Sequence, residues 1–199
     1  MTKYPESIQK IILLLRKFPG VGKKTAERYA FQMISWKKED LELLSSLISG
    51  LKKNIALCSE CGAIYEGSGC FFCNHTNRDR QLLCIISSPK DIFSLENTRL
   101  YNGLYHVMPG LISPIDGIGP DELNLQHLKD RIQKNKISEV ILALDSTIEG
   151  DATSLYVKKE IETLGVFVSR LGLGMPMGSS LEYVDEGTLS RAFSSRSPL

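Results

Sequence analysis

The sequence CSECGAIYEGSGCFFC, residues 58–73, decides how the middle of this chain folds. It contains two Cys-x2-Cys pairs separated by eight residues. A Cys-x2-Cys turn places two thiolates on one side of a metal ion, and two such turns complete a tetrahedron that suits zinc at sulfur distances of about 2.3 Å. Because four thiolates leave no coordination position open, we expect one structural zinc ion per chain, bound by Cys58, Cys61, Cys70 and Cys73.

Two disulfide bonds or four free thiols are the alternatives to a metal site. We expect a cytoplasmic protein, because MTKYPESIQK lacks a signal-peptide pattern and no aliphatic run could span a bilayer. Thiols stay reduced in that compartment, which favours metal binding. The cysteine segment has few large apolar side chains, so packing alone is not expected to hold it. Cys84 is expected in the core, and His75 is not needed as a ligand beside four thiolates.

The charge of the chain is unevenly distributed. Residues 1–80 contain 13 Lys and Arg against 8 Asp and Glu, a net charge of +5, whereas residues 81–199 contain 11 against 15, a net charge of −4. A basic front half indicates that an anion such as nucleic acid binds there. The alternative is that solvated helix faces are rich in lysine. The composition, 42% hydrophobic and 24% charged residues, is typical of a globular protein with a core.

Apolar side chains at helical spacing predict a helix over residues 7–17, and Pro19–Gly22 then breaks the chain. A second helix follows this break, and a third is expected over residues 40–52. The residues expected on the inner faces of the second and third helices are Ala26, Tyr29, Ala30, Met33, Ile34, Leu44, Leu47, Ile48 and Leu51.

The break between the first two helices has the form of a helix-hairpin-helix turn. Gly20 and Gly22 permit a tight turn whose backbone N–H groups point outward at the start of a helix, where the dipole favours an anion. Lys23, Lys24 and Arg28 stand beside that helix end. We interpret these five residues as a phosphate-binding site that contacts the DNA backbone rather than the bases. The alternative is an ordinary helical hairpin with solvated lysines.

Strand and helix patterns alternate after residue 80, which predicts a parallel sheet with helices on its faces. The expected strands are residues 81–86, 105–108, 139–144 and 166–171, and the expected helices are residues 90–97, 121–134 and 151–164. Asp121, after Pro120, is the expected cap of the second of these helices. The fold class is therefore α+β and built from several parts.

Three acidic residues, Asp145, Glu149 and Asp151, follow the expected strand over residues 139–144. Sites in open parallel sheets form at the carboxyl ends of strands, and carboxylates are hard ligands that suit magnesium. We name residues 145–151 the acidic loop, and its three carboxylates are candidates for a partner contact or for weak magnesium binding. The alternative is a solvated loop in which Asp151 caps the following helix.

Five stretches of the chain resemble the RecR family of bacterial recombinational-repair proteins, in the same order and with the same spacing. They are PGVGKKTAERYAF at 19–31, the cysteine pairs followed by Arg78–Asp79, YHVMPGLISPIDGIGPDEL at 105–123, EVILALDSTIEGDAT at 139–153 and LGMPMGSSLEYVDEGTL at 173–189. The resemblance covers essentially the whole chain.

The resemblance implies a protein that is not an enzyme. Members of this family form clamps or rings on DNA, built from dimers that can pair into tetramers. With RecO, and in many bacteria RecF, they help RecA to displace single-strand-binding protein at gaps, which implies a location with the nucleoid. Lys24 and Arg28 match the DNA-contacting residues of the family hairpin.

The resemblance also divides the chain into four parts. Residues 1–53 correspond to the helix-hairpin-helix region and residues 54–79 to a zinc finger. Residues 80–172 resemble a Toprim domain, a fold that is shared with topoisomerases and primases. Residues 173–199 form a C-terminal segment that resembles a Walker B element.

The chain departs from catalytic Toprim domains, which bind magnesium through a glutamate after the first strand and an Asp-x-Asp after a later one. The first position falls here at Ser87 or Ser88, and the later one has a single aspartate, Asp145. Two-metal phosphoryl chemistry is therefore not expected, and magnesium binding is doubtful. A Toprim-type nickase, nuclease or primase is one alternative, and a zinc-ribbon adaptor that never binds DNA is another.

One acidic pair and two histidines are expected to have no catalytic role. Asp185–Glu186 is expected to be surface charge or a further contact. His106 and His127 are expected in the core or on the surface, since neither has a nucleophile or carboxylate at motif spacing.

Overall fold

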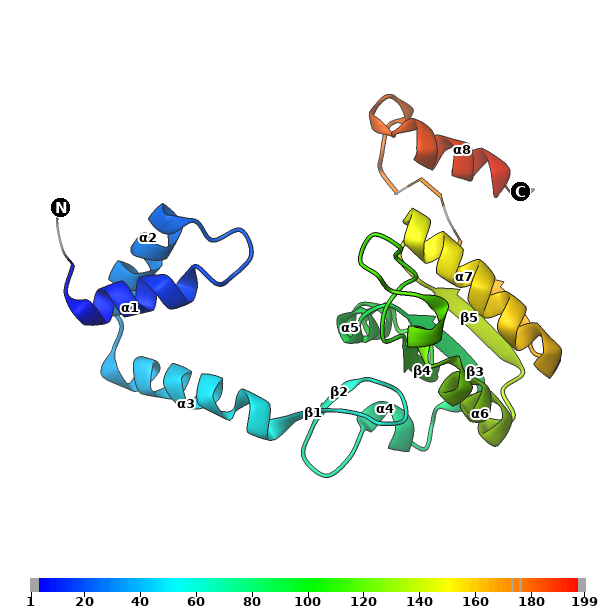
Figure 1. The fold of residues 1–199 in the computed structure, drawn as a ribbon, viewed down its shortest axis with the longest axis horizontal. Coiled ribbons are helices and arrows are strands. Elements are labelled where there is room, and N and C mark those ends of the chain that lie inside the picture. The colour runs from blue at the N-terminus through cyan, green and yellow to red at the C-terminus, as the bar shows by residue number, and fades with distance from the viewer. Residues whose placement is uncertain (1–3, 173, 176, 197–199) are drawn as a thin grey trace. The chain divides into compact units, whose positions relative to one another are not determined.

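A computed structural model describes residues 4–172, 174–175 and 177–196 of the chain (Figure 1). The chain divides into two compact units, Met1–Asn54 and Ile55–Leu199. We refer to them as the hairpin unit and the sheet unit. The cysteine segment, residues 58–73, belongs to the sheet unit and is called the cysteine loop below.

The described residues of the hairpin unit form the helices α1 (Glu6–Leu15), α2 (Lys23–Ile34) and α3 (Lys38–Asn54). Its core is small, since Ile12 of α1 packs against Ala26 and Ala30 of α2. Both alanines are at most 1% exposed, and their short side chains allow the two helices to approach closely. The predicted burial of Ala26 and Ala30 is thus confirmed.

The other expected inner-face residues of the hairpin unit are not buried. Tyr29 and Ile34 are 42% and 61% exposed, and none of the described residues of α3 is buried. Leu47 and Ile48 of α3 are 60% and 58% exposed. This part of the prediction was wrong, because helical spacing identifies an apolar stripe but not whether the same chain covers it.

In the part of the sheet unit that the structure describes, four parallel strands form one sheet in the order β4-β3-β5-β6. These strands are β3 (Asp79–Ile86), β4 (Gly103–Val107), β5 (Glu139–Ala143) and β6 (Phe167–Arg170). The remaining elements are β1 (Ile55–Leu57), β2 (Ile64–Glu66), α4 (Phe71–Asn74), α5 (Pro89–Thr98), η1 (Pro120–Leu123), α6 (Leu125–Asn135), α7 (Ile148–Ile161), η2 (Glu162–Leu164), η3 (Leu181–Tyr183) and α8 (Glu186–Ser194). The predicted parallel sheet is confirmed.

Each face of the sheet has its own core, because side chains of a strand alternate between its two faces. Leu83 and Ile85 of β3 contribute to the core that contains residues of α6 and α7, whereas Cys84 and Ile86 contribute to the core on the opposite face. The second core also contains Ile92 of α5 and residues of the cysteine loop. Cys84 is 2% exposed, as predicted.

The cysteine loop packs against this second face. Ala63 and Phe72 are 0% and 6% exposed and lie in one apolar cluster with Ile86 and Tyr105. The apolar neighbours of this segment thus include side chains of the sheet. The sequence pattern shows few apolar residues within the segment but not the sheet surface that surrounds them.

Two predicted helix starts are corrected by the structure. The helix expected over residues 121–134 is divided, because the short helix η1 ends at Leu123 and Asn124 adopts a left-handed conformation with φ +47° before α6 begins. The helix expected over residues 151–164 starts earlier, at Ile148, and its cap is Thr147, whose hydroxyl accepts the Gly150 N–H at 3.1 Å. Asp151 therefore lies within the first turn of α7 and does not cap it.

The sequence patterns did not predict the β1–β2 hairpin or the helix α8. Ile55–Leu57 and Ile64–Glu66 pair as antiparallel strands around the first cysteine pair. Asp185 caps α8 by accepting the Thr188 N–H at 2.9 Å, so its carboxylate has a structural role. Within the predicted C-terminal segment, residues 173, 176 and 197–199 lie outside the described residues.

None of the helices in the described residues is both long enough and apolar enough to cross a membrane.

The contact between the acidic loop and α7 requires glycine at position 150. A Cβ atom on Gly150 would lie 1.9 Å from the Asp145 carbonyl oxygen. We expect Gly150→Ala to lower the free energy of unfolding by about 1–3 kcal/mol, because backbone must shift to relieve the clash. Urea denaturation measures this change. Gly119→Ala is the control, since nothing lies within 4 Å of its added Cβ, and an equal effect of both substitutions would contradict the prediction.

Candidate metal centre and nucleic-acid interface

The four cysteines of the cysteine loop bring their sulfur atoms together. The Cys61 and Cys70 Sγ atoms are 3.5 Å apart, those of Cys58 and Cys73 are 3.9 Å apart, and all four lie within 4.8 Å of one another. A tetrahedral zinc site with bonds of about 2.3 Å places its sulfurs about 3.8 Å apart, whereas a disulfide bond is about 2.05 Å long. The geometry fits a metal ion and not disulfides, and all four thiols are free.

The first cysteine pair is shaped by the β1–β2 hairpin. The Cys58 N–H donates to the Ala63 carbonyl and the Gly62 N–H donates to the Cys58 carbonyl, both at 2.8 Å. Gly62 has φ +74°, and an added Cβ would lie 2.7 Å from the Val107 side chain. Glycine is therefore needed here both for the turn and for the close approach to β4.

Backbone hydrogen bonds fix the cysteine loop to the sheet. The Val107 N–H of β4 donates to the Cys61 carbonyl at 2.8 Å. The guanidinium of Arg80 in β3 donates to the Cys73 carbonyl at 3.4 Å. Each of the two cysteine pairs is thus attached to a strand, which keeps the four sulfurs in register.

Arg78 joins the cysteine loop to α5 and β4, and sequence reasoning did not identify this role. Its guanidinium lies 5.2 Å from the Phe72 ring centroid and 5.4 Å from that of Tyr105, within the range of cation–π contacts. It also donates to Glu96 and to the Gly103 carbonyl, both at 2.9 Å. The partners of Arg78 lie as many as 27 residues away, so no local pattern reveals them.

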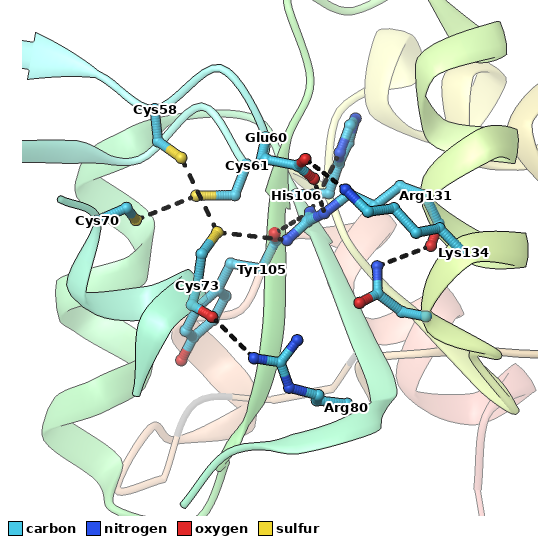
Figure 2. A network of polar contacts seen from close by, with 11 residues as sticks. Cys58, Glu60, Cys61, Cys70, Cys73, Arg80, Tyr105, His106, Arg131 and Lys134 are labelled. Carbon is cyan, nitrogen blue, oxygen red and sulfur yellow. Dashed lines mark hydrogen bonds and ion pairs between the residues drawn. The ribbon is translucent and has the colours of Figure 1, made fainter. Parts of the chain in front are cut away.

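Charged side chains of α6 lie beside the cysteine loop (Figure 2). The Lys134 ammonium binds the Glu60 carboxylate at 2.7 Å, and this hydrogen bond holds the pKa of Glu60 below its usual value. The guanidinium of Arg131 lies 3.8 Å from the Cys73 sulfur. A hydrogen bond from Cys61, together with the positive charge of Arg131, lowers the pKa of Cys73.

We call the four cysteine sulfurs the sulfur cluster, and none of the three histidines belongs to it. His106 is 4% exposed, and burial, reinforced by the charge of Arg131, lowers its pKa to about 3. His127 lies beside it, with ring centroids 5.6 Å apart. His75 Nδ1 accepts the Asn77 N–H at 3.3 Å. Each of the three histidines therefore contacts protein groups other than the four cysteine sulfurs.

The turn of the hairpin unit presents backbone donors and cations together. The Val21 N–H donates to the Phe18 carbonyl at 3.1 Å, and Gly20 has φ +75°, a conformation that favours glycine. Gly22 is the extended N-cap of α2 and provides no side chain to bind the first N–H groups of that helix. These N–H groups are left for water or for an anion.

Lys23, Lys24 and Arg28 are all exposed around this helix end. Lys24 and Arg28 are four residues apart on α2 and therefore lie on one face of the helix. Among the ion pairs formed by the described residues, none involves these three cations. Their charges are available to an external anion.

The acidic loop is only partly open to an external ligand. The Asp151 carboxylate binds Arg170 of β6 and Arg191 of α8, and the hydrogen bond from Arg170 contributes most to lowering its pKa. Asp145 is exposed and Glu149 is partly buried. Among the described residues, these carboxylates do not form a group of three that could hold a metal ion.

The edge of the sheet carries a neutral residue where catalytic relatives of the fold carry an acid. Ser87 directly follows β3, and Asp145 follows the neighbouring strand β5. The Ser87 hydroxyl is buried and makes no hydrogen bond within the described residues. The structure thus brings one uncharged and one acidic side chain to this edge.

Three family descriptions match consecutive parts of the chain. Residues 8–51 match the helix-hairpin-helix region of RecR, residues 81–172 match the Toprim domain, and residues 174–197 match the C-terminal region of RecR. The chain is 48% identical to the recombination protein RecR of Protochlamydia amoebophila, with 98% of each chain covered. It is 47% identical to that of Chlamydia abortus over the whole of both chains, and 40% identical to that of Staphylococcus aureus over 98% of this chain and 99% of the relative.

We expect the purified protein to contain one divalent metal ion per chain, and Cys58→Ser with Cys61→Ser to abolish metal binding. Removal of two thiolates leaves too few ligands for a closed tetrahedral site. Elemental analysis after gel filtration measures the metal content. Cys84→Ala is the matched control, because this buried cysteine lies outside the sulfur cluster and the variant should keep its metal. Wild-type protein without any metal would refute the site.

Proposed function

The chain belongs to the RecR family of recombination proteins, and from that membership we propose that it acts as a non-enzymatic DNA clamp in recombinational repair. The observation that carries the proposal is the turn before α2, where uncapped helix N–H groups and three exposed cations lie together. Both features favour phosphate. Neither selects a base, so we propose sequence-independent binding to the DNA backbone.

The metal in the cysteine loop is proposed to be zinc with a structural role. Four thiolates at tetrahedral spacing suit zinc, and they leave no position for a substrate or for an activated water. Zinc bound there would strengthen the connection between β1, β2 and α4 and would take no part in chemistry. We propose no magnesium cofactor, since Asp151 already binds two arginines.

The partners that we propose are DNA, RecO and, where it is present, RecF, in a complex that helps RecA to load on gapped DNA covered by single-strand-binding protein. We also propose self-association into dimers and tetrameric rings in the cytoplasm, at the nucleoid. Self-association is supported by the unburied apolar face of the hairpin unit. A groove of about 720 Å³ between α1 and α3 is lined by Leu14, Phe18, Leu44 and Ile48, with further apolar neighbours.

Lys24→Ala and Arg28→Ala should each weaken DNA binding to a similar extent on unrelated sequences. Each substitution removes one phosphate contact, so the slope of log K against log salt should fall by about 0.9. Fluorescence anisotropy with gapped duplexes at several salt concentrations measures both quantities. Lys10→Ala is the control, because the Lys10 ammonium is paired with Glu6 at 2.6 Å on α1. If both variants bound like the wild type, the turn would not be the DNA site.

The chain should not cleave DNA in the presence of magnesium. Ser87 cannot replace the carboxylate that two-metal chemistry requires at this edge, and Asp145 alone supplies too few ligands. Incubation with nicked and gapped plasmid, followed by gel electrophoresis, measures cleavage. Asp145→Asn separates the protein from a contaminating nuclease. Cleavage by the wild type that Asp145→Asn abolishes would show instead a Toprim-type enzyme.

A further inference from the structure

The surroundings of the Cys73 sulfur contain more positive than negative side-chain charge. A pocket of about 200 Å³ beside it is lined by Arg80, Arg131 and Lys134 and by a single carboxylate, that of Glu60. The three cations thus exceed the one anion by two charges. Such an excess is costly where the side chains are buried, because a buried charge requires a partner.

Among the three cations that line this pocket, Arg131 is the one whose charge is not stabilised by solvent. Its side chain is 3% exposed, whereas that of Lys134 is 68% exposed. The nearest carboxylate oxygen, on Glu60, lies 4.0 Å from Arg131 Nε, and Glu60 is already bound to Lys134 at 2.7 Å. Arg131 Nε itself is buried and makes no hydrogen bond within the described residues. Glu60 is therefore a weak counter-charge for Arg131.

The other contacts of Arg131 connect the cysteine loop with β4 (Figure 2). Nη2 points to the Cys73 sulfur at 3.8 Å. Nη1 donates to the Tyr105 carbonyl and lies 3.4 Å from His106 Nδ1. Since the His106 ring is held neutral by burial, neither partner in β4 supplies a negative charge. The sulfur cluster is the remaining source.

We propose that Arg131 is the outer counter-charge of the metal centre and couples metal binding to the stability of the sheet. A divalent ion on four thiolates carries a net charge of −2, which would supply the negative charge that the buried Arg131 lacks. The Arg131 N–H groups would then hydrogen-bond a metal-bound thiolate and the β4 backbone together. Loss of the metal would leave a buried guanidinium without a counter-charge next to the sheet.

This inference rests on the proposed metal site but not on DNA binding. It assigns Arg131 a positioning role, since outer partners orient metal ligands and commonly change metal affinity by about 10- to 100-fold. Two other roles are open to Arg131. It could only brace the Tyr105 carbonyl, or it could bind a phosphate in the small pocket. Neither of these roles would change the electronic state of the Cys73 sulfur.

The test compares Arg131→Met with Lys134→Met, a matched loss of a cation one turn away on α6 that does not contact sulfur. Competition with a chromogenic chelator should show a loss of metal affinity of about 10- to 100-fold for Arg131→Met. Lys134→Met should stay close to the wild type, because the exposed Lys134 is screened by solvent. Inorganic phosphate should leave the affinity of the wild type unchanged.

Cobalt-loaded protein provides a readout that a purely structural role would not change. A hydrogen bond to a thiolate lowers the energy of its donor orbital, so the sulfur-to-cobalt charge-transfer band should move to longer wavelength in Arg131→Met and not in Lys134→Met. Chelation should also lower the thermal midpoint of the wild type more than that of Arg131→Met. The variant no longer contains a buried charge that needs the metal centre.

The outcomes separate this inference from the metal site itself. Wild type without metal would overturn both. If the wild type contains metal but Arg131→Met has the same metal affinity and the same cobalt band, only the role of Arg131 is overturned. A loss of metal affinity in the wild type when inorganic phosphate is added would also overturn that role. If Arg131→Met does not fold, Arg131→Gln decides. Its amide can donate a hydrogen bond to the Tyr105 carbonyl but carries no charge, so wild-type affinity and an unshifted band would again overturn the inference.

Discussion

The sheet unit depends on the packing of the cysteine loop against one face of its parallel sheet. Strand β3 is buried on both faces, so Cys84 and Ile86 require a cover on the side away from α6 and α7. Helix α5 supplies only part of that cover, through Ile92, and the cysteine loop supplies Phe72. A segment with so few apolar residues can cover a sheet because the sulfur cluster and the hydrogen bond from Val107 hold it in shape.

The hairpin unit has a much smaller core than the sheet unit. Its core consists of Ile12, Ala26 and Ala30, and the apolar stripe of α3 is not covered by the described residues of the same unit. So small a core contributes little stability, since hydrophobic stabilisation scales with the apolar area that is buried. The turn at Gly20, between α1 and α2, is exposed. The unit is therefore arranged to present a surface rather than to enclose one.

The sequence predicted those features whose physical cause is local. Two Cys-x2-Cys turns and the alternation of strand and helix are patterns within short windows, and both appear in the structure as expected. The partners of Arg78 and Arg131 could not be predicted in this way, because they come from other elements, as many as 71 residues away. The predictions of a buried face on α3 and of a helix start at residue 121 were wrong for a related reason. Spacing reports which side chains share a face, not what lies opposite them.

Ion pairs between residues far apart in the sequence also determine the surroundings of Asp151, near the carboxyl edge of the sheet. Asp151 was a candidate magnesium ligand in the sequence, but Arg170 and Arg191 bind both of its oxygens. Arg191 belongs to α8, so this carboxylate attaches the C-terminal helix to the start of α7. Among the residues that the structure describes, the carboxylates at this edge do not form a group of three that could hold a metal ion. The Asp151 carboxylate therefore connects α8 and β6 to the start of α7.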